Sequence, residues 1–108
     1  MGLFDFLKTA DINQGLQQYR DTPGAMLIDV READEYAQGR VPGSVNVPLS
    51  RLENDIGDVV EDLNTPLFVY CLGGSRSARA VAALTQMGYE AVTNIGGIRS
   101  YRGEVERG

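Results

Sequence analysis

The sequence predicts an α/β domain with a mainly parallel central sheet and helices on both faces. Short apolar segments of strand length alternate along the chain with segments of helical periodicity. These apolar segments are continuous rather than alternating, which is typical of strands that are covered on both sides. The 108 residues suffice for one compact domain. We therefore expect a single domain over residues 1–108, with a lead-in over 1–10 and a core over 11–103.

The first half of the chain is expected to begin with a helix over residues 11–20. Asp11 can cap its first turn, and Ile12, Leu16 and Tyr19 recur at helical spacing. Proline and glycine residues divide the following segment into short elements. In order, we expect a turn over 21–24, a buried strand over 25–30, a short helix over 32–38 ended by Gly39, a loop over 41–48 with a short strand at 45–47, and one or two short helices over 49–63 capped by Ser50.

The second half is expected to contain the clearest strand and the clearest helix. Residues 67–71 are apolar and rich in residues that favour strands. A glycine-rich loop follows, and then a helix that runs to about Met87 and stops at Gly88. The buried stripe of this helix is expected to consist of Ala80, Ala83, Leu84 and Met87. The remaining elements are expected to be a buried strand over 91–95, a turn at 96–97 and a final helix over 98–102.

Composition argues against several classes of function. The net charge is −5, and nucleic-acid binding needs clustered lysine and arginine, so we expect no nucleic-acid partner. No run is long enough to cross a bilayer, and the N-terminal apolar residues are too few for a signal peptide and are interrupted by Asp5. The single cysteine cannot form an internal disulfide, which favours a reducing compartment. We therefore expect a cytoplasmic protein without membrane contacts.

Arginines gather in the second half of this acidic chain. They are Arg76, Arg79, Arg99, Arg102 and Arg107. A local cationic site in an acidic protein is compatible with a small anionic substrate. A scatter of solvated charges is the alternative interpretation.

Cys71 stands where a buried strand is expected to end, before a glycine-rich loop that leads into a helix. Ligands of open α/β sheets bind at this edge, and a helix N-terminus offers free amides and a positive dipole end. Gly73 and Gly74 allow the loop amides to converge on one point. Such a loop lowers the pKa of a thiol, and Arg76 adds a permanent positive charge.

The activation of Cys71 cannot involve a histidine, because the chain has none. The loop itself must therefore supply the positive environment that a nucleophilic thiolate needs. A buried structural cysteine at the end of a strand is the alternative interpretation. A Walker-type phosphate loop is excluded, since no Gly-Lys-Ser or Gly-Lys-Thr occurs.

Four segments resemble the rhodanese family in order and spacing, over roughly residues 11 to 103. The segment Cys71-Leu-Gly-Gly-Ser-Arg-Ser77 resembles the active-site loop of that family, Cys-x-x-Gly-x-Arg-Ser. The other three segments are Ile28-Asp-Val-Arg-Glu32 followed by Glu35 and Tyr36, Gly39-Arg-Val-Pro-Gly-Ser-Val-Asn-Val-Pro48, and Asn94-Ile-Gly-Gly-Ile98.

The resemblance implies a rhodanese-like fold and a sulfurtransferase. Cys71 would accept the outer sulfur of a donor such as thiosulfate as a persulfide, and a thiol or cyanide would remove it. A protein of a sulfur relay is a further candidate partner, and neither a cofactor nor a metal is expected. The loop amides would hold the terminal sulfur of the persulfide. The loop residues are Leu72, Gly73, Gly74, Ser75, Arg76 and Ser77.

Three charged residues receive supporting roles from the same resemblance. Arg76 would orient the loop or bind an anionic donor. Asp29 and Arg31 would brace the loop or form a buried ion pair. Arg40 stands where the family usually has histidine, and Tyr101 where tryptophan is frequent. We treat both as variation and expect a solvated Arg40, with a change in substrate preference or local stability as the alternative.

Two other functions are weighed against sulfur transfer. A rhodanese-like module can be a regulatory or binding domain, usually after loss of the cysteine, but here the cysteine and the loop are intact. Phosphatases and arsenate reductases of the same fold have five residues between cysteine and arginine. Here four residues separate Cys71 from Arg76, and a loop shorter by one residue suits a sulfur atom better than a phosphate.

Overall fold

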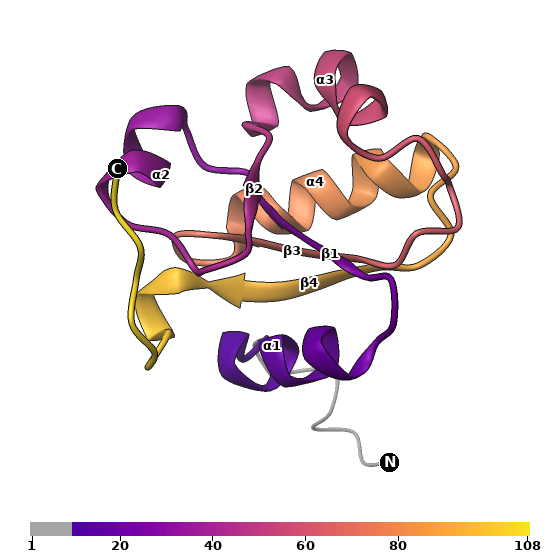
Figure 1. Cartoon of the computed structure of the whole chain (residues 1–108). Coiled ribbons are helices and arrows are strands. Elements are labelled where there is room, and N and C mark those ends of the chain that lie inside the picture. Colours follow the sequence, from indigo (N-terminus) through magenta and orange to yellow (C-terminus); the bar gives the residue numbers. More distant parts are fainter. Residues whose placement is uncertain (1–9) are drawn as a thin grey trace.

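Four short strands form a parallel sheet in the computed structural model, which describes residues 10–108 (Figure 1). Neighbouring strands are parallel throughout, in the spatial order β2-β1-β3-β4. The fold class predicted from the sequence is therefore confirmed. The strands are β1 (Met26–Asp29), β2 (Val45–Asn46), β3 (Leu67–Cys71) and β4 (Val92–Gly97).

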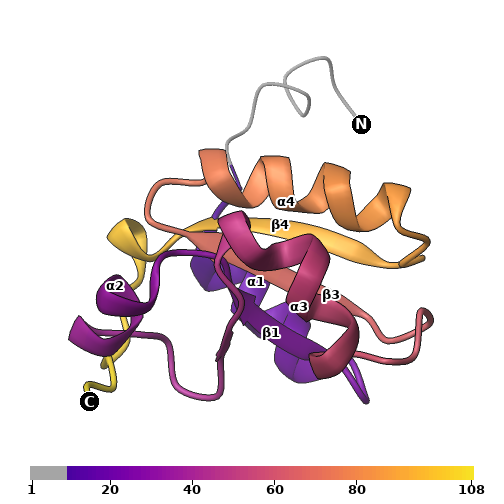
Figure 2. The same ribbon diagram turned by 90° about the horizontal axis from the view of Figure 1, so that it is seen from above.

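Helices cover both faces of this sheet, as Figures 1 and 2 show from two directions. Helix α1 (Ile12–Asp21) lies on one face, and α3 (Leu52–Val59) and α4 (Ser75–Gln86) lie on the other. All residues of the central strand β3 are buried, because each of its sides is covered. This burial places the carboxyl end of β3, and hence Cys71, at the middle of one edge of the sheet.

The sheet separates two hydrophobic clusters, and successive residues of β3 face them alternately. Phe68 and Tyr70 belong to the cluster on the α1 side, whereas Val69 and Cys71 belong to the cluster under α3 and α4. Helix α1 packs very closely against β4, because a Cβ at Gly15 would lie 2.3 Å from the Cβ of Ile95.

The expected cap of α1 is present. The carboxylate of Asp11 accepts a hydrogen bond of 3.0 Å from the backbone amide of Asn13. The short helix α2 (Ala33–Gln38) also lies where the sequence placed it, and a capping box between Glu32 and Glu35 starts it. Both helices begin where their own side chains satisfy the free amides of the first turn.

The expectation that Ser50 caps a helix is wrong. After Pro48 the chain forms a 3-10 helix, η2 (Leu49–Arg51), and α3 follows directly. Ser50 lies inside this turn, and its hydroxyl donates to the carboxylate of Glu32 at 3.4 Å instead. Helix α3 therefore begins without a side-chain cap.

Helix α4 begins earlier than expected, inside the glycine-rich loop. Its N-cap is Gly74, whose φ of 107° lies in the left-handed region that glycine adopts at low cost. The helix ends as predicted, since Gly88 has a φ of 104° and its amide bonds to the carbonyl of Thr85. The assignment of Met87 to the buried stripe is wrong, because this side chain lies beyond the last turn and is exposed.

The expected turn at Gly96-Gly97 is also wrong, because both glycines belong to β4. The register against β3 shifts by one residue just before Gly96, which forms a β-bulge. A Cβ at Gly97 would lie 2.1 Å from the carbonyl oxygen of Leu72. The glycines therefore allow β4 to run against the loop that follows Cys71. The expected final helix is only a 3-10 turn, η3 (Ile98–Ser100).

Arg40 is not solvated, contrary to expectation. Its side chain is 18% exposed, and its guanidinium lies 4.7 Å from the ring centre of Tyr36. The backbones of Arg40 and Glu106 exchange two hydrogen bonds of 2.9 Å, and Nη1 of Arg40 donates to the carbonyl of Gly108. Arg40 thus holds the C-terminal segment beside α2. No helix within residues 10–108 is long and apolar enough to cross a membrane.

Candidate active site

Cys71 is the last residue of β3, and the loop behind it curls back onto its sulfur. The backbone amide of Gly74 donates to Sγ at 3.0 Å, and the hydroxyl oxygen of Ser77 lies 3.4 Å from Sγ. The cysteine is 1% exposed, so the sulfur lies at the bottom of the loop. The N-terminus of α4, with its free amides and positive dipole end, faces the same edge of the sheet.

The surroundings of the thiol lower the pKa of Cys71. Burial acts in the opposite direction and raises this pKa, because it disfavours the charged thiolate. Hydrogen bonds from the Ser77 hydroxyl and from the amides of Ser77, Gly74 and Gly73 outweigh the burial, so the pKa falls below its ordinary value. The loop therefore favours the nucleophilic form of the thiol without any histidine.

Asn94 connects β4 with this loop, and the sequence did not single it out as a site residue. Its Oδ1 accepts a hydrogen bond of 2.9 Å from the amide of Gly96 and lies 2.7 Å from the Ser77 hydroxyl oxygen, whose single proton bonds either this Oδ1 or the Cys71 thiolate. Its Nδ2 donates to the carbonyl of Gly74 at 3.3 Å. The side chain thus holds Ser77 and Gly74, two of the groups that contact Sγ. The only sequence signal for a role of Asn94 is its position two residues before the Gly-Gly pair of β4.

Arg76 lies on the first turn of α4 and is paired with Glu35 of α2. Its two terminal nitrogens donate to the two carboxylate oxygens at 2.7 and 3.0 Å. The hydrogen bonds from Arg76 hold the pKa of Glu35 down to about 2. This ion pair joins the loop to α2. The Arg76 guanidinium is therefore bonded to a carboxylate, although the sequence also indicates it as a binding group for an anionic donor. The sequence places Glu35 in a segment that resembles the family but indicates no role for it.

Asp29 and Arg31 form a buried ion pair at the end of β1. Nη2 and Nε of Arg31 donate to the Asp29 carboxylate at 2.7 and 3.1 Å, and Nη2 also donates to the carbonyl of Gly39 at 2.7 Å. The Asn46 side chain bonds the carbonyls of both residues, at 3.0 and 2.9 Å. Within residues 10–108, neither charged side chain is bonded to the loop over 72–77. The pair therefore braces the segment after β1.

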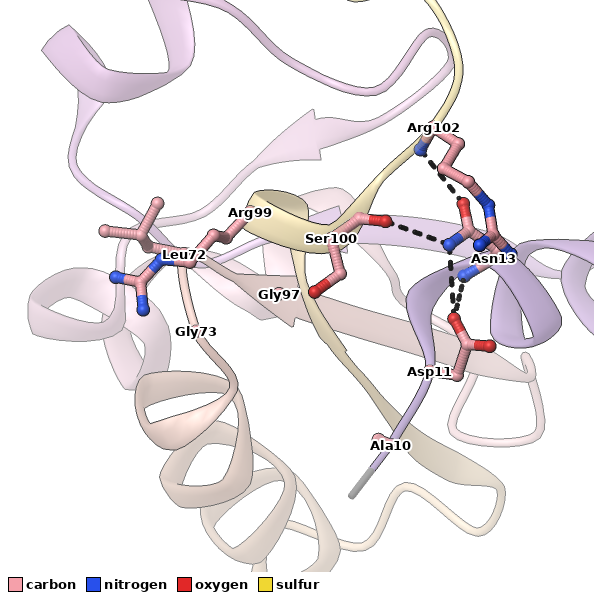
Figure 3. A pocket seen from close by; sticks show the side chains of 9 residues that line it. All are labelled: Ala10, Asp11, Asn13, Leu72, Gly73, Gly97, Arg99, Ser100 and Arg102. Atoms are coloured by element: carbon pink, nitrogen blue, oxygen red, sulfur yellow. Dashed lines mark hydrogen bonds between the residues drawn. The ribbon is translucent and has the colours of Figure 1, made fainter. Parts of the chain in front are cut away.

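The outer surface of the loop borders two hollows, and Leu72 lies between them. One cavity of about 400 Å³ lies among the loop, the start of α1 and the chain around η3 (Figure 3). The other, of about 330 Å³, lies toward α2 and includes Arg31, Glu35 and Arg107. Leu72 is 37% exposed at the surface of the loop. The loop is thus bordered by a hollow on two sides.

The remaining loop residues differ in exposure. Gly73 and Ser75 are exposed, Gly74 is half-buried, and Ser77 is fully buried. Solvent therefore contacts the loop at Gly73 and Ser75, whereas Cys71 and Ser77 are covered. Within residues 10–108, no three His, Cys, Asp or Glu side chains are grouped to hold a metal ion.

The chain belongs to the rhodanese-like family, since the rhodanese-like domain model matches residues 13–104. The thiosulfate sulfurtransferase PspE of Escherichia coli strain K12 is 40% identical over 72 residues, which are 67% of this chain and 69% of that protein. A sulfurtransferase of Allochromatium vinosum is 33% identical over 81 residues, 75% of this chain and 74% of that protein.

A solved structure gives the same result. The fold is similar to that of a rhodanese with anions from E. coli, with a TM-score of 0.72 and 36% identity over 78% of this chain and 99% of that one. At the level of the family, these relatives support a sulfurtransferase of the rhodanese type.

Proposed function

We propose that this protein moves a sulfane sulfur from an anionic donor such as thiosulfate to a thiol or cyanide, through a persulfide on Cys71. The observation that carries the proposal is the hydrogen bond of 3.0 Å from the Gly74 amide to Sγ. It shows the loop turned toward the sulfur rather than away from it. A buried structural cysteine would not need such a donor, since a thiol packs well among apolar side chains.

The first step begins with the Cys71 thiolate, which the loop stabilises. Its sulfur attacks the outer sulfur of thiosulfate and forms a new S–S bond. The S–S bond of thiosulfate breaks, and sulfite leaves with the bonding electron pair. The enzyme retains a persulfide whose terminal sulfur is negatively charged. No oxidant, reductant or cofactor is consumed, because the sulfur moves between two sulfur atoms.

The loop amides are suited to the charge that this step creates. The amide of Gly74 donates to Sγ at 3.0 Å, and the amides of Gly73 and Ser77 also lower the pKa of Cys71. A persulfide extends the charge by one atom, and preformed amides stabilise such a charge without reorganisation. Leu72, Ser75 and Arg76 complete the loop, and Arg76 keeps it in place through Glu35.

The second step restores the free cysteine. Cyanide attacks the terminal sulfur, a C–S bond forms, and the S–S bond of the persulfide breaks. Thiocyanate leaves, and the bonding pair remains on Cys71 as the thiolate. A thiolate acceptor reacts in the same way and leaves as its own persulfide. A protein thiol of a sulfur relay is an alternative acceptor with the same chemistry.

Two features argue against the other functions considered. The cysteine and its loop donors are present, which a purely regulatory module does not require. The Arg76 guanidinium is bonded to Glu35, so it is not free to clamp a phosphate or arsenate. A lone thiol that must remain reduced between turnovers fits a reducing compartment such as the cytoplasm.

Intact-protein mass spectrometry tests the proposal. Thiosulfate should add the mass of one sulfur atom, and cyanide should remove it and release thiocyanate. Cys71→Ser should abolish both events while the circular dichroism spectrum stays unchanged. A reduced Cys71 that gains no sulfur from thiosulfate or a polysulfide would contradict the proposal, and turnover of an aryl phosphate would favour the phosphatase.

A further inference from the structure

Two of the arginines near Cys71 are already neutralised by carboxylates. Arg31 is paired with Asp29, and Arg76 is paired with Glu35, each through two or more hydrogen bonds. Paired in this way, both guanidinium groups have a reduced attraction for a third anion. A dianionic sulfur donor must therefore find its positive partner elsewhere around the loop.

Arg99 is held against the loop from the other side. Its backbone amide donates to the carbonyl of Leu72 at 3.1 Å, which fixes the start of η3 to the loop. Its guanidinium lies beside Gly73, because a Cβ on Gly73 would be 3.9 Å from Nη1 of Arg99. The amide of Gly73 is itself one of the groups that lower the pKa of Cys71. Arg99 therefore lies beside a loop residue that follows Cys71 by two positions.

Arg99 lines the cavity of about 400 Å³ on the side where the loop residues Leu72 and Gly73 lie (Figure 3). The side chain of Arg99 extends toward Leu72, whereas Asp11 and Asn13 lie at the opposite side of the cavity (Figure 3). Asp11 is engaged there with Asn13. No ion pair joins Arg99 to another residue in 10–108, and its side chain is part of the lining of this cavity.

We propose that Arg99 binds the anionic oxygens of the sulfur donor in this cavity and so selects small donors that carry a sulfonate or carboxylate. The inference rests on the proposed function and assigns a substrate group to a residue outside the loop. The cavity exceeds the volume of thiosulfate, so larger organic thiosulfonates and carboxylated persulfides also fit. The guanidinium fork suits such oxygens because it can donate two parallel hydrogen bonds.

Alkylation of Cys71 tests the charge of this site without any sulfur transfer. Iodoacetate and iodoacetamide react by the same step, in which the thiolate forms an S–C bond and iodide leaves, but only iodoacetate is an anion. The rate with iodoacetate divided by the rate with iodoacetamide should fall about fivefold in Arg99→Gln, as expected for loss of one nearby, partly screened charge. Arg20→Gln removes the same charge at the distal end of α1, where it is exposed, and should leave the ratio unchanged.

Steady-state kinetics then identify the substrate that Arg99 binds. In Arg99→Gln, KM for thiosulfate should rise about fivefold at equal kcat, by the same electrostatic argument, while KM for cyanide and for a carboxylated thiol acceptor stays constant. An unchanged alkylation ratio would overturn the inference even if the enzyme transfers sulfur. A rise in acceptor KM alone would overturn it as well. A lower ratio in a protein that never forms a persulfide would support the anion site and refute the proposed function.

Discussion

The guanidinium of Arg76 donates to both carboxylate oxygens of Glu35, at 2.7 and 3.0 Å, across 41 positions of sequence. The first turn of α4 is thereby fastened to α2, on the outer side of the loop around Cys71. The exposed fractions of the two side chains are 31% and 29%, so water screens the pair only in part. A bidentate, half-buried pair of this kind is stronger than an ordinary surface ion pair.

Glu35→Gln should lower the free energy of unfolding by about 1–2 kcal/mol, because the charge-assisted bonds to Arg76 are lost. Glutamine keeps an oxygen for the capping bond from the Glu32 amide, so α2 retains its start. Asp55→Asn is the matched control, since it breaks the exposed pair with Arg51 and should cost about 0.5 kcal/mol or less. Urea unfolding at pH 7 measures both changes.

Acid should remove the difference in free energy of unfolding between wild type and Glu35→Gln. The pKa of Glu35 is lowered from 4.5 to about 2 in the folded state, so its contribution is complete above pH 4.5. The contribution is lost as the pH falls toward 2, where the folded carboxylate also binds a proton. Two results would contradict a strong ion pair between Glu35 and Arg76. One is an equal loss of unfolding free energy in Glu35→Gln and Asp55→Asn at pH 7, and the other is a difference between wild type and Glu35→Gln that persists at pH 2.

Ser77→Ala should raise the pKa of Cys71. The Ser77 hydroxyl is the largest of the contributions that lower this pKa, and it lies 3.4 Å from Sγ. Loss of one such hydrogen bond should slow alkylation by iodoacetamide at pH 7 about three- to tenfold. The pH dependence of the alkylation rate should shift to higher pH.

Thr85→Ala provides the control for Ser77→Ala. It removes a hydroxyl that donates to a backbone carbonyl of the same helix, far from the cysteine in sequence. Its alkylation profile should match that of wild type. A Ser77→Ala profile that coincides with wild type would show that the loop amides suffice to stabilise the thiolate.

Gly97→Ala should destabilise the domain by about 2 kcal/mol or more, since its Cβ would lie 2.1 Å from the carbonyl oxygen of Leu72. That oxygen is backbone and cannot rotate away, so β4 or the loop must shift. Thermal unfolding should show the loss, and the alkylation rate of Cys71 should change with it.

Gly57→Ala is the opposite case and serves as the control. Gly57 lies within α3, is exposed, and has no atom within 4 Å of a Cβ built there. Alanine should therefore stabilise the helix by about 0.5–1 kcal/mol. A Gly97→Ala protein as stable as wild type would mean that β4 and the loop are not in the tight contact described.

Errors in the sequence-based expectations occurred where an element continues into a neighbour. Ser50 was placed at a helix start, but the 3-10 turn after Pro48 leads directly into α3. Gly96-Gly97 was expected to turn the chain, but the sheet extends through both glycines because the loop approaches them closely. At Ser50 a neighbouring turn moved the helix start, whereas at the two glycines a tertiary contact overrode the local conformational preference.

Arg40 illustrates the same limit for a single side chain. Its place in the sequence indicated a solvated charge, yet it packs on Tyr36 and pairs with the backbone of Glu106. No local pattern could reveal the partner Glu106, because it lies 66 positions away in the chain.

The sequence by itself determined the alternation of strands and helices, the capped start at Asp11, and a cysteine between a buried strand and a glycine-rich loop. These features depend on residues close together in the chain, through side-chain periodicity and the conformational freedom of glycine. The tertiary structure alone decided that Glu35 pairs with Arg76, that Asn94 contacts Ser77, and that Arg99 lies beside the loop. Such pairings depend on strand order and register, which bring together residues that no local pattern relates.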